Sequence, residues 1–448
     1  MGKQSIFVTT LAAITLFILL CVQGHAEEEM MPMPEHDGMS MPSHNHESST
    51  VHPPHSDCSK DEFFDRSTQM CFPLATPGMT MRMFMLHGNA FGVGIFESGP
   101  RGRTSFASPN MLMVDVGTSV SDRQYLNLEL MATAELWTFP KQGSPELLQI
   151  GEANSQGQPY IDAQHPHSSP LMGLTLSDTI RLSDTNDQVL RLFFAPRGES
   201  TDGPIPFMHR PTGMVNPDAP LGHHIGQDVG HISSTVMGGL LKLNKLQIEA
   251  STFNGTEPEP TAVNLPIGTP NSYAARLSYE FTPEMIGMFS AAYINQPEAL
   301  QPDIKNVSRY SASLYTQTNL GPAWNYYNSL IFGSTHHYDH VPQLISVGEE
   351  FLFAGGHPRI WGRIEALQRT PNELAITNIP GPMNPRWVGA FTLGYTHALT
   401  TWNDLEIALG ASSTVDFLPD AFSSAYGGQN PWTWKVFLQI GGMKMQNF

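Results

Sequence analysis

The chain has 448 residues and a formal net charge of -18, because 41 acidic residues outnumber 23 Lys and Arg residues. This charge argues against nucleic acid as a partner, since nucleic-acid binding requires clustered Lys and Arg. It favours cations as partners, although an acidic composition also serves solubility alone.

The N-terminus carries one positive charge at Lys3, an apolar run over residues 6–22 and the small-residue segment GHA. This order predicts a secretory signal peptide over residues 1–26, with the mature chain beginning at Glu27. No later apolar stretch reaches the ~20 residues that a membrane helix requires. If the processed chain crosses a membrane, we expect strands to cross it.

Three cysteines are present, at positions 21, 58 and 71. A cysteine at the end of the signal suggests a lipoprotein, but Leu20 stands where a lipoprotein signal needs a small residue. In an exported chain, Cys58 and Cys71 are expected to form one disulfide. A metal or redox pair is the alternative, although the CxxC spacing is absent.

The segment after the signal, residues 27–78, is rich in methionine, histidine and acid. Its stretch MMPMPEHDGMSMPSHNHE lacks Lys and Arg, and its polar, Pro-interrupted character predicts disorder. Thioether sulfur suits Cu(I), whereas imidazole suits Cu(II), nickel and zinc, so a mixed set favours copper or silver over zinc. The alternative is a biased leader without a function. The candidate ligands are Met30, Met31, Met33, His36, Met39, Met41, His44, His46, His52 and His55.

From about residue 80 onward, apolar and polar residues alternate. In RQYLNLELMATAELW, residues 123–137, every second position from Leu126 is apolar, and the positions between include Asn127 and Glu129. An apolar face opposite a charged face, with aromatics near the ends, predicts strands between lipid and a wet lumen. A soluble β-sandwich also alternates, so single strands do not decide. The pattern recurs over 273–281, 359–367 and 404–411.

Connection lengths make the stronger case for a barrel, because outer-membrane barrels alternate tight periplasmic turns with longer outer loops. Tight links occur near 119–122, 183–187, 244, 282–284, 321–322, 355–357 and 399–400. Longer stretches occur near 97–108, 138–170, 196–229, 254–271, 296–308, 336–343, 369–386 and 413–431. We therefore predict an all-β fold, a transmembrane antiparallel β-barrel of about 16 strands over residues 79–448, preceded by a disordered N-terminal periplasmic tail.

The final stretch, WKVFLQIGGMKMQNF, places Trp434, Val436 and the terminal Phe448 on one parity of a last strand. A terminal Phe resembles the signal by which bacterial outer-membrane proteins are recognised for assembly, although polar residues near the end depart from its fully apolar form. The predicted location is the outer membrane of a Gram-negative bacterium, with both chain ends in the periplasm.

Histidines recur in the predicted outer loops, in the motifs DAQHPH, PFMHRP and APLGHHIGQDVGH. Prolines stiffen these loops by fixing φ, which favours ordered segments folded into or over the pore mouth. If the histidines converge, they form a divalent-ion site with Asp162 or Asp228 as a hydrogen-bonding partner. Otherwise each one caps a turn or pairs with a lumen acid. The candidate ligands are His165, His167, His209, His223, His224 and His231.

The first predicted strand carries a methionine at every second residue from Met79 to Met85, followed by His87. These side chains share one face, because strand side chains alternate with period two. A row facing the lumen would pass soft ions along the wall, but Arg82 on the opposite face favours a row facing lipid. We expect the methionines to face lipid.

A signal peptide, a Met/His-rich acidic segment and then a barrel is the layout of the copper-resistance outer-membrane proteins, the B component of copper-resistance systems. The chain resembles that family in architecture and tail, which implies copper binding and tolerance. We expect the tail to capture copper ions, or a similar soft metal, and the barrel to sequester or pass them. The alternative is a general porin-like channel for small solutes with an incidental tail.

No catalytic motif supports an enzyme, because GxSxG, HExxH and a Gly-rich phosphate loop with lysine are absent. Ser168 follows His167, but a catalytic triad is defined by geometry rather than adjacency. We expect no enzyme and no organic cofactor. The expected partners are metal ions or small solutes and outer-membrane lipid, and no feature of the sequence indicates the oligomeric state.

Overall fold

The computed structural model describes residues 58–59, 61–78, 80–167, 169–227, 230, 232–257, 267–297, 304–337, 342–377 and 379–447. The predicted signal peptide, the tail ligands between Met30 and His55, and the terminal Phe448 lie outside these residues. The chain divides into two compact units, of which the second, Ser49–Phe448, contains all the described residues.

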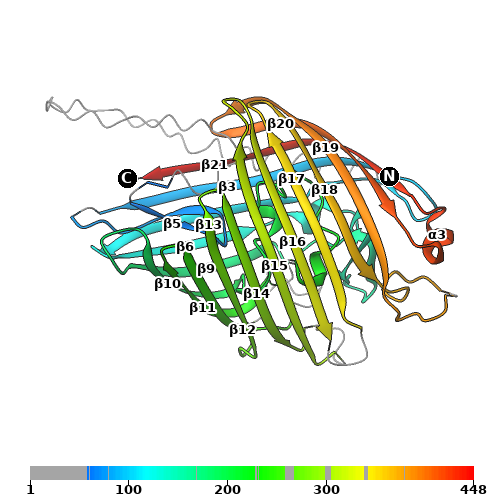
Figure 1. The fold of residues 1–448 in the computed structure, drawn as a ribbon, viewed down its shortest axis with the longest axis horizontal. Coiled ribbons are helices and arrows are strands. Elements are labelled where there is room, and N and C mark those ends of the chain that lie inside the picture. The colour runs from blue at the N-terminus through cyan, green and yellow to red at the C-terminus, as the bar shows by residue number, and fades with distance from the viewer. Residues whose placement is uncertain are drawn as a thin grey trace. The chain divides into compact units, whose positions relative to one another are not determined.

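A closed antiparallel barrel dominates the fold, as Figure 1 shows. Its strands are β3 (Arg82–Glu97), β4 (Thr104–Ala107), β5 (Asn110–Ser121), β6 (Gln124–Ala132), β9 (Leu171–Arg181), β10 (Gln188–Gly198), β11 (Ser233–Leu243), β12 (Leu246–Asn254), β13 (Ser272–Thr282), β14 (Met285–Asn295), β15 (Asn306–Asn319), β16 (Asn325–His337), β17 (Leu344–Ala354), β18 (Pro358–Arg369), β19 (Arg386–Trp402), β20 (Leu405–Phe417) and β21 (Trp432–Asn447). Because β4 and β5 pair with successive stretches of β3, they share one position, and the barrel has 16 strand positions. The prediction of about 16 strands is confirmed.

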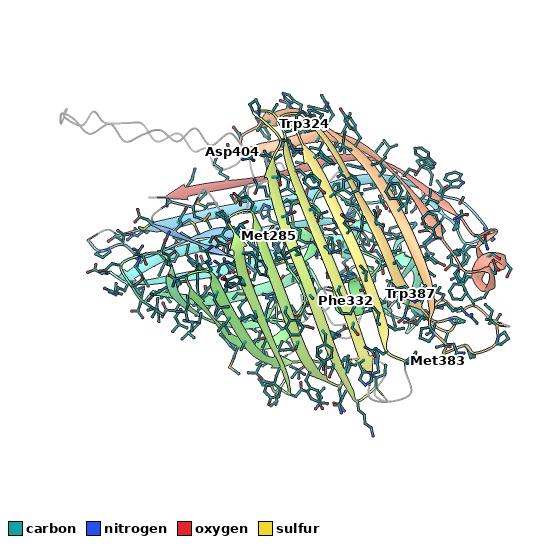
Figure 2. The ribbon with its side chains drawn as sticks, viewed as in Figure 1. Met285, Trp324, Phe332, Met383, Trp387 and Asp404 are labelled. Carbon is teal, nitrogen blue, oxygen red and sulfur yellow. A yellow bond between two sulfur atoms is a disulfide. The ribbon has the colours of Figure 1, made fainter. Side chains whose placement is uncertain are left out.

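Outward-facing side chains are apolar and inward-facing ones are polar, as the alternation predicted. On β13, Leu277 is 44% exposed while its neighbours Arg276 and Ser278 are buried. Exposed aromatic side chains gather near both strand ends, which is typical of membrane barrels. In Figure 2, Trp324 and Asp404 lie at one end of the wall, and Trp387 and Met383 lie toward the other.

Two predictions about where strands end are wrong. The strand expected over 123–137 ends at Ala132, and Glu135–Thr138 forms a short helix, α2. The backbone leaves the sheet there because the Thr133 hydroxyl accepts the Glu135 N–H at 3.2 Å, which competes with strand pairing. The tight link expected at 399–400 lies instead at Asn403-Asp404, where both residues have positive φ. Asn and Asp tolerate this left-handed turn conformation better than the Leu-Thr pair does.

Residues 62–73, expected to belong to the disordered tail, instead form an ordered hairpin that packs against the inner wall. It consists of β1 (Glu62–Asp65) and β2 (Met70–Pro73), and the predicted disulfide between Cys58 and Cys71 joins its two sides. Arg66, at its tip, donates to Glu280 of β13 at 2.8 Å and to the Asn244 carbonyl at 3.0 Å. Because Asn244 lies in the tight turn between β11 and β12, this N-terminal hairpin occupies the tight-turn end of the lumen.

A second hairpin, β7 (Ser144–Ala153) paired with β8 (Pro159–Gln164), belongs to the long connection between β6 and β9. The other helical elements in the described part of the chain are η1 (Phe207–His209), η2 (His223–Gln227) and α3 (Asp420–Tyr426). Among the described residues, no helix has the length and apolar character needed to span a membrane.

The orientation of the side chains on β13 leads to a testable prediction. We expect Leu277→Arg to lower the free energy of unfolding by about 2–4 kcal/mol, because it places a charge on the lipid face near mid-strand. Tyr273→Arg, near the strand end, is the matched control and is expected to cost about 0–1 kcal/mol. Equilibrium urea unfolding in lipid vesicles measures both, and equal losses would contradict the assigned membrane band.

Candidate functional site

The connection between β10 and β11, residues 199–232, folds into the barrel interior, and we call it the lumenal segment. Its backbone N–H groups donate to hydroxyls of the inner wall. The pairs are Thr201 to Ser251 (2.9 Å), Gly203 to Ser290 (2.9 Å) and Ile205 to Tyr315 (3.0 Å). The three acceptors lie on β12, β14 and β15, and the Thr201 hydroxyl donates to the Ala274 carbonyl of β13 at 3.0 Å, so the segment is attached to four successive wall strands.

A buried charge cluster holds the centre of the lumenal segment. Arg210 donates through Nε and Nη2 to the two carboxylate oxygens of Glu350 at 2.9 and 2.8 Å. Thr212 donates to the same carboxylate at 2.8 Å, and Arg363 does so at 3.2 Å. The Arg210 and Glu350 side chains are 0% and 3% exposed. Loss of one partner would leave an uncompensated buried charge, so the cluster fixes the segment against β17 and β18.

Further cations and amides hold the far part of the segment. Arg369 of β18 donates to the Leu221 carbonyl at 2.6 Å, and Lys435 of β21 pairs with Asp218. Asn89 of β3 donates to a main-chain carbonyl of the segment at 2.8 Å. The lumenal segment therefore contacts the wall from β12 around to β3, which narrows the lumen.

Three of the predicted ligands converge, His223 and His224 of this segment and His165 of the connection between β6 and β9. One ligand nitrogen of each lies within 4.8 Å of the others. The rings of His165 and His224 are 5.4 Å apart, and those of His223 and His224 are 4.6 Å apart. Nitrogens bound to one tetrahedral zinc ion lie about 3.4 Å apart, given bonds of about 2.1 Å. Small side-chain rotations would bring these three imidazoles, the histidine trio, onto one divalent ion.

The backbone of η2 positions two members of the trio. Gly226 has φ of 67°, and a Cβ atom there would lie 2.7 Å from the Ser334 nitrogen, so only glycine fits this close approach. Ser346 of β17 accepts a hydrogen bond from Gln227 at 2.9 Å and donates to the Ile225 carbonyl at 2.9 Å. These contacts hold η2 against β17, while His165 arrives from the end of β8.

His167 is engaged differently. Its Nδ1 lies 2.6 Å from a Glu135 carboxylate oxygen, and its ring is 6.1 Å from that of His165. Burial alone would lower the pKa of His167, but the Glu135 carboxylate outweighs burial and raises that pKa above its ordinary value. Because the Glu135 carboxylate engages Nδ1, this geometry fits the alternative in which a histidine pairs with a lumen acid.

His209 lies in η1 of the lumenal segment. Burial lowers its pKa to about 4, so the imidazole is neutral at neutral pH. Its Nδ1 atom is shielded from solvent and has no hydrogen-bond partner in the part of the chain that the structure describes. The neighbouring Glu199, at the start of the segment, has a pKa raised to about 7 by burial.

Other predicted site residues are not brought to the trio. Asp162, one expected hydrogen-bonding partner, instead accepts from Arg101 at 2.5 Å and from the Tyr426 hydroxyl at 2.7 Å. His231 and Asp228 lie outside the described residues, as do the ten tail ligands.

The methionine row of β3 faces the lumen, which corrects the expectation that it faces lipid. Met83 and Met85 are each 2% exposed, and His87 is buried on the same face. Arg82 was a misleading guide to the lumenal face because it is the first residue of β3. At a strand end, a charged side chain reaches water on either face of the sheet. The continuation of the row through His87 and Asn89 was the sequence signal for the inner face.

Solved outer-membrane proteins share this architecture. OmpF of Salmonella typhi, solved in complex with daunomycin, aligns with a TM-score of 0.50 at 10% identity, over 81% of this chain and 97% of that chain. The fold is that of a porin-like outer-membrane barrel. An anion-selective porin from Comamonas acidovorans aligns with a TM-score of 0.47 at 11% identity, over 82% of this chain and 99% of that chain. No family model and no curated protein matches the chain.

We expect Glu350→Gln to release the lumenal segment, because Arg210 and Arg363 would lose the charge that compensates both. The expected loss of stability is about 3 kcal/mol, and limited proteolysis should cut within 199–232. Asp184→Asn breaks the exposed pair with Arg123 and serves as the control, with an expected cost under ~1 kcal/mol. Equal protease resistance of the two variants would contradict the anchoring role of Glu350.

Proposed function

We propose that the protein is a channel of a Gram-negative outer membrane that admits small solutes through a lumen narrowed by its own internal segments. The observation that carries this proposal is a closed barrel with a charged inner wall, crossed by a lumenal segment that is bonded to the wall from β12 to β3. Such an interior is typical of membrane barrels, which are either water-filled or plugged by loops. The same interior supplies no catalytic motif, and we propose no enzymatic activity.

Two small cavities in the described part of the interior suit ions better than larger solutes. A cavity of about 90 Å3 lies between the N-terminal hairpin and the lumenal segment, and another of about 30 Å3 lies beside Met214. These volumes hold a few water molecules or a single ion. A larger solute would require the lumenal segment to move.

We expect the native barrel to show small single-channel conductance in planar bilayers. Replacing residues 204–226 by a short Gly/Ser linker should raise the conductance several-fold, because it removes the chain that crosses the lumen. The Asp184→Asn variant should conduct like the native protein. If neither the native barrel nor the linker variant conducts, the channel proposal is wrong.

The histidine trio supports a second candidate function, the handling of copper-class metal ions. Three imidazoles, each with one nitrogen within 4.8 Å of the others, suit Cu(II), nickel or zinc. The Met/His-rich tail and the resemblance to the copper-resistance B proteins point the same way, and we propose that the tail captures the ions that the barrel receives. Deleting residues 27–56 should then lower copper tolerance in cells, and unchanged tolerance would refute the role of the tail.

We expect the full-length protein to bind one more equivalent of Zn²⁺ or Cu²⁺ than a His165→Ala/His223→Ala/His224→Ala variant. Isothermal titration in detergent measures the difference. His357→Ala/His397→Ala is the matched control. These two rings also lie close together, 6.0 Å apart, but His357 lies in the tight turn between β17 and β18, at the opposite end of β17 from η2. Equal stoichiometry in the native and triple-variant proteins would exclude metal binding at the trio.

A further inference from the structure

Eleven methionines gather in two clusters inside the barrel, on the side formed by β21, β3, β5, β6 and β9. The cluster nearer the tight-turn end contains Met70, Met81, Met83, Met85, Met443 and Met445, packed with Ala75 and Tyr125. The second cluster contains Met111, Met113, Met131, Met172 and Met208, packed with Ile232. The lumenal wall thus concentrates thioether groups on one side.

The strand register sets these side chains in a row. Met443 of β21 lies opposite His87 of β3, which lies opposite Met113 of β5, which in turn lies opposite Met131 of β6. Directly paired residues of antiparallel strands project to the same face. The row therefore crosses four neighbouring strands on the inner face. Met443 joins it only because barrel closure pairs the last strand, β21, with the first, β3.

The 90 Å3 cavity lies against this row. Its lining includes four thioethers and one imidazole, from Met70, Met113, Met131, Met172 and His209. Three of these methionines also belong to the second cluster. The His209 Nδ1 is shielded and without a hydrogen-bond partner among the described residues, and a bound cation would satisfy it. Soft donors therefore line one small cavity.

The charges around the cavity favour a cation. The lining carboxylates outnumber the guanidinium groups by four to two. Arg191 pairs with Asp65 at 3.2 Å, and Arg276 pairs with Glu249 at 2.9 Å. The two other carboxylates, Glu129 and Glu199, belong to no ion pair within the described part of the chain. Because burial raises the pKa of Glu199 to about 7, this carboxyl is only partly ionised at neutral pH, and a cation bound in the cavity would favour its ionised form.

A second cavity continues the series toward the histidine trio. Met111, Met208 and Met214 line it together with Glu135 and Phe207. Glu135 holds His167, and the Phe207 ring lies 6.0 Å from that of His223. Along the lumen, the available ligands change from thioether to imidazole.

We propose that Met113, Met131 and Met172, together with His209, form a binding site for a soft monovalent cation, Cu(I) or Ag(I), inside the barrel. Neutral thioethers prefer soft ions, whereas calcium, magnesium and similar hard ions prefer oxygen ligands. The carboxyl groups of Glu129 and Glu199 can compensate the charge of a bound ion by ionising, and the sulfur ligands select the ion. This inference rests on the proposed channel function and names the class of solute.

Silver titration of the full-length protein in detergent, labelled with 13C at the methionine methyl groups, tests the site. Each methyl resonance is assigned through a single Met→Leu variant. Silver binding to the tail methionines and to the lumenal methionines can then be followed separately in one sample. We expect the Met113, Met131 and Met172 resonances to shift at substoichiometric Ag(I), and those of the exposed Met237 and Met383 to stay unchanged. Unshifted lumenal resonances when the tail resonances have saturated would overturn the proposal.

Substitution by leucine isolates the sulfur atoms, because Leu and Met have similar volumes and the core tolerates the exchange. Met113→Leu/Met131→Leu/Met172→Leu should lower the affinity of the lumenal site for Ag(I) at least tenfold. The control Met237→Leu/Met285→Leu/Met383→Leu should leave it unchanged, and equal affinities in both variants would refute a role of the sulfur atoms.

Potassium chloride conductance of the same two variants separates this proposal from the channel function. Normal conductance with no lumenal silver binding would support the channel function and refute the metal site. Silver binding with no conductance in any variant would support the site and contradict transport.

Discussion

The pairing of β21 with β3 is the constraint on which the rest of the structure depends. These strands, the last and the first of the barrel, pair from Thr433 opposite Glu97 to Asn447 opposite Met83. In lipid, an unpaired backbone N–H or C=O costs several kcal/mol, so an open sheet edge is not tolerated. Closure removes both edges at once. Closure also separates an inner face of the sheet from an outer face. The apolar residues of the alternating sequence then contact lipid, and the polar residues line the lumen.

The lumenal face carries charges of both signs, and these pair with near neighbours rather than across an open pore. Arg276 bonds to Glu249 on the adjacent strand, and Arg359 bonds to Glu406 two strands away. The internal segments use the same chemistry, because Arg210 enters the lumen to meet Glu350. Filling the lumen is therefore compatible with its charge, since Glu350 and Lys435 of the wall gain the partners Arg210 and Asp218 as the segment enters.

The lumenal segment links the two proposed functions. It narrows the passage and also contributes Met208, His209, His223 and His224 to the cavities and the histidine trio. A movement of this segment would alter the passage and the ligand sets together. Binding of an ion to ligands from both the wall and the segment would stabilise the narrowed state, because the ion would add a link between them.

The sequence by itself determined the wall. Period-two alternation, together with tight and long connections in strict succession, predicted the barrel, its strand number and the Cys58–Cys71 bridge, because these depend on local geometry and composition. It mispredicted the lumenal methionine row, since Arg82 at a strand end carries no information about facing. Only the tertiary structure decided that His165 meets His223 and His224, because that contact requires two long connections to enter one lumen. Their paths depend on distant partners such as Glu350, Arg369 and Ser346, which no local pattern specifies.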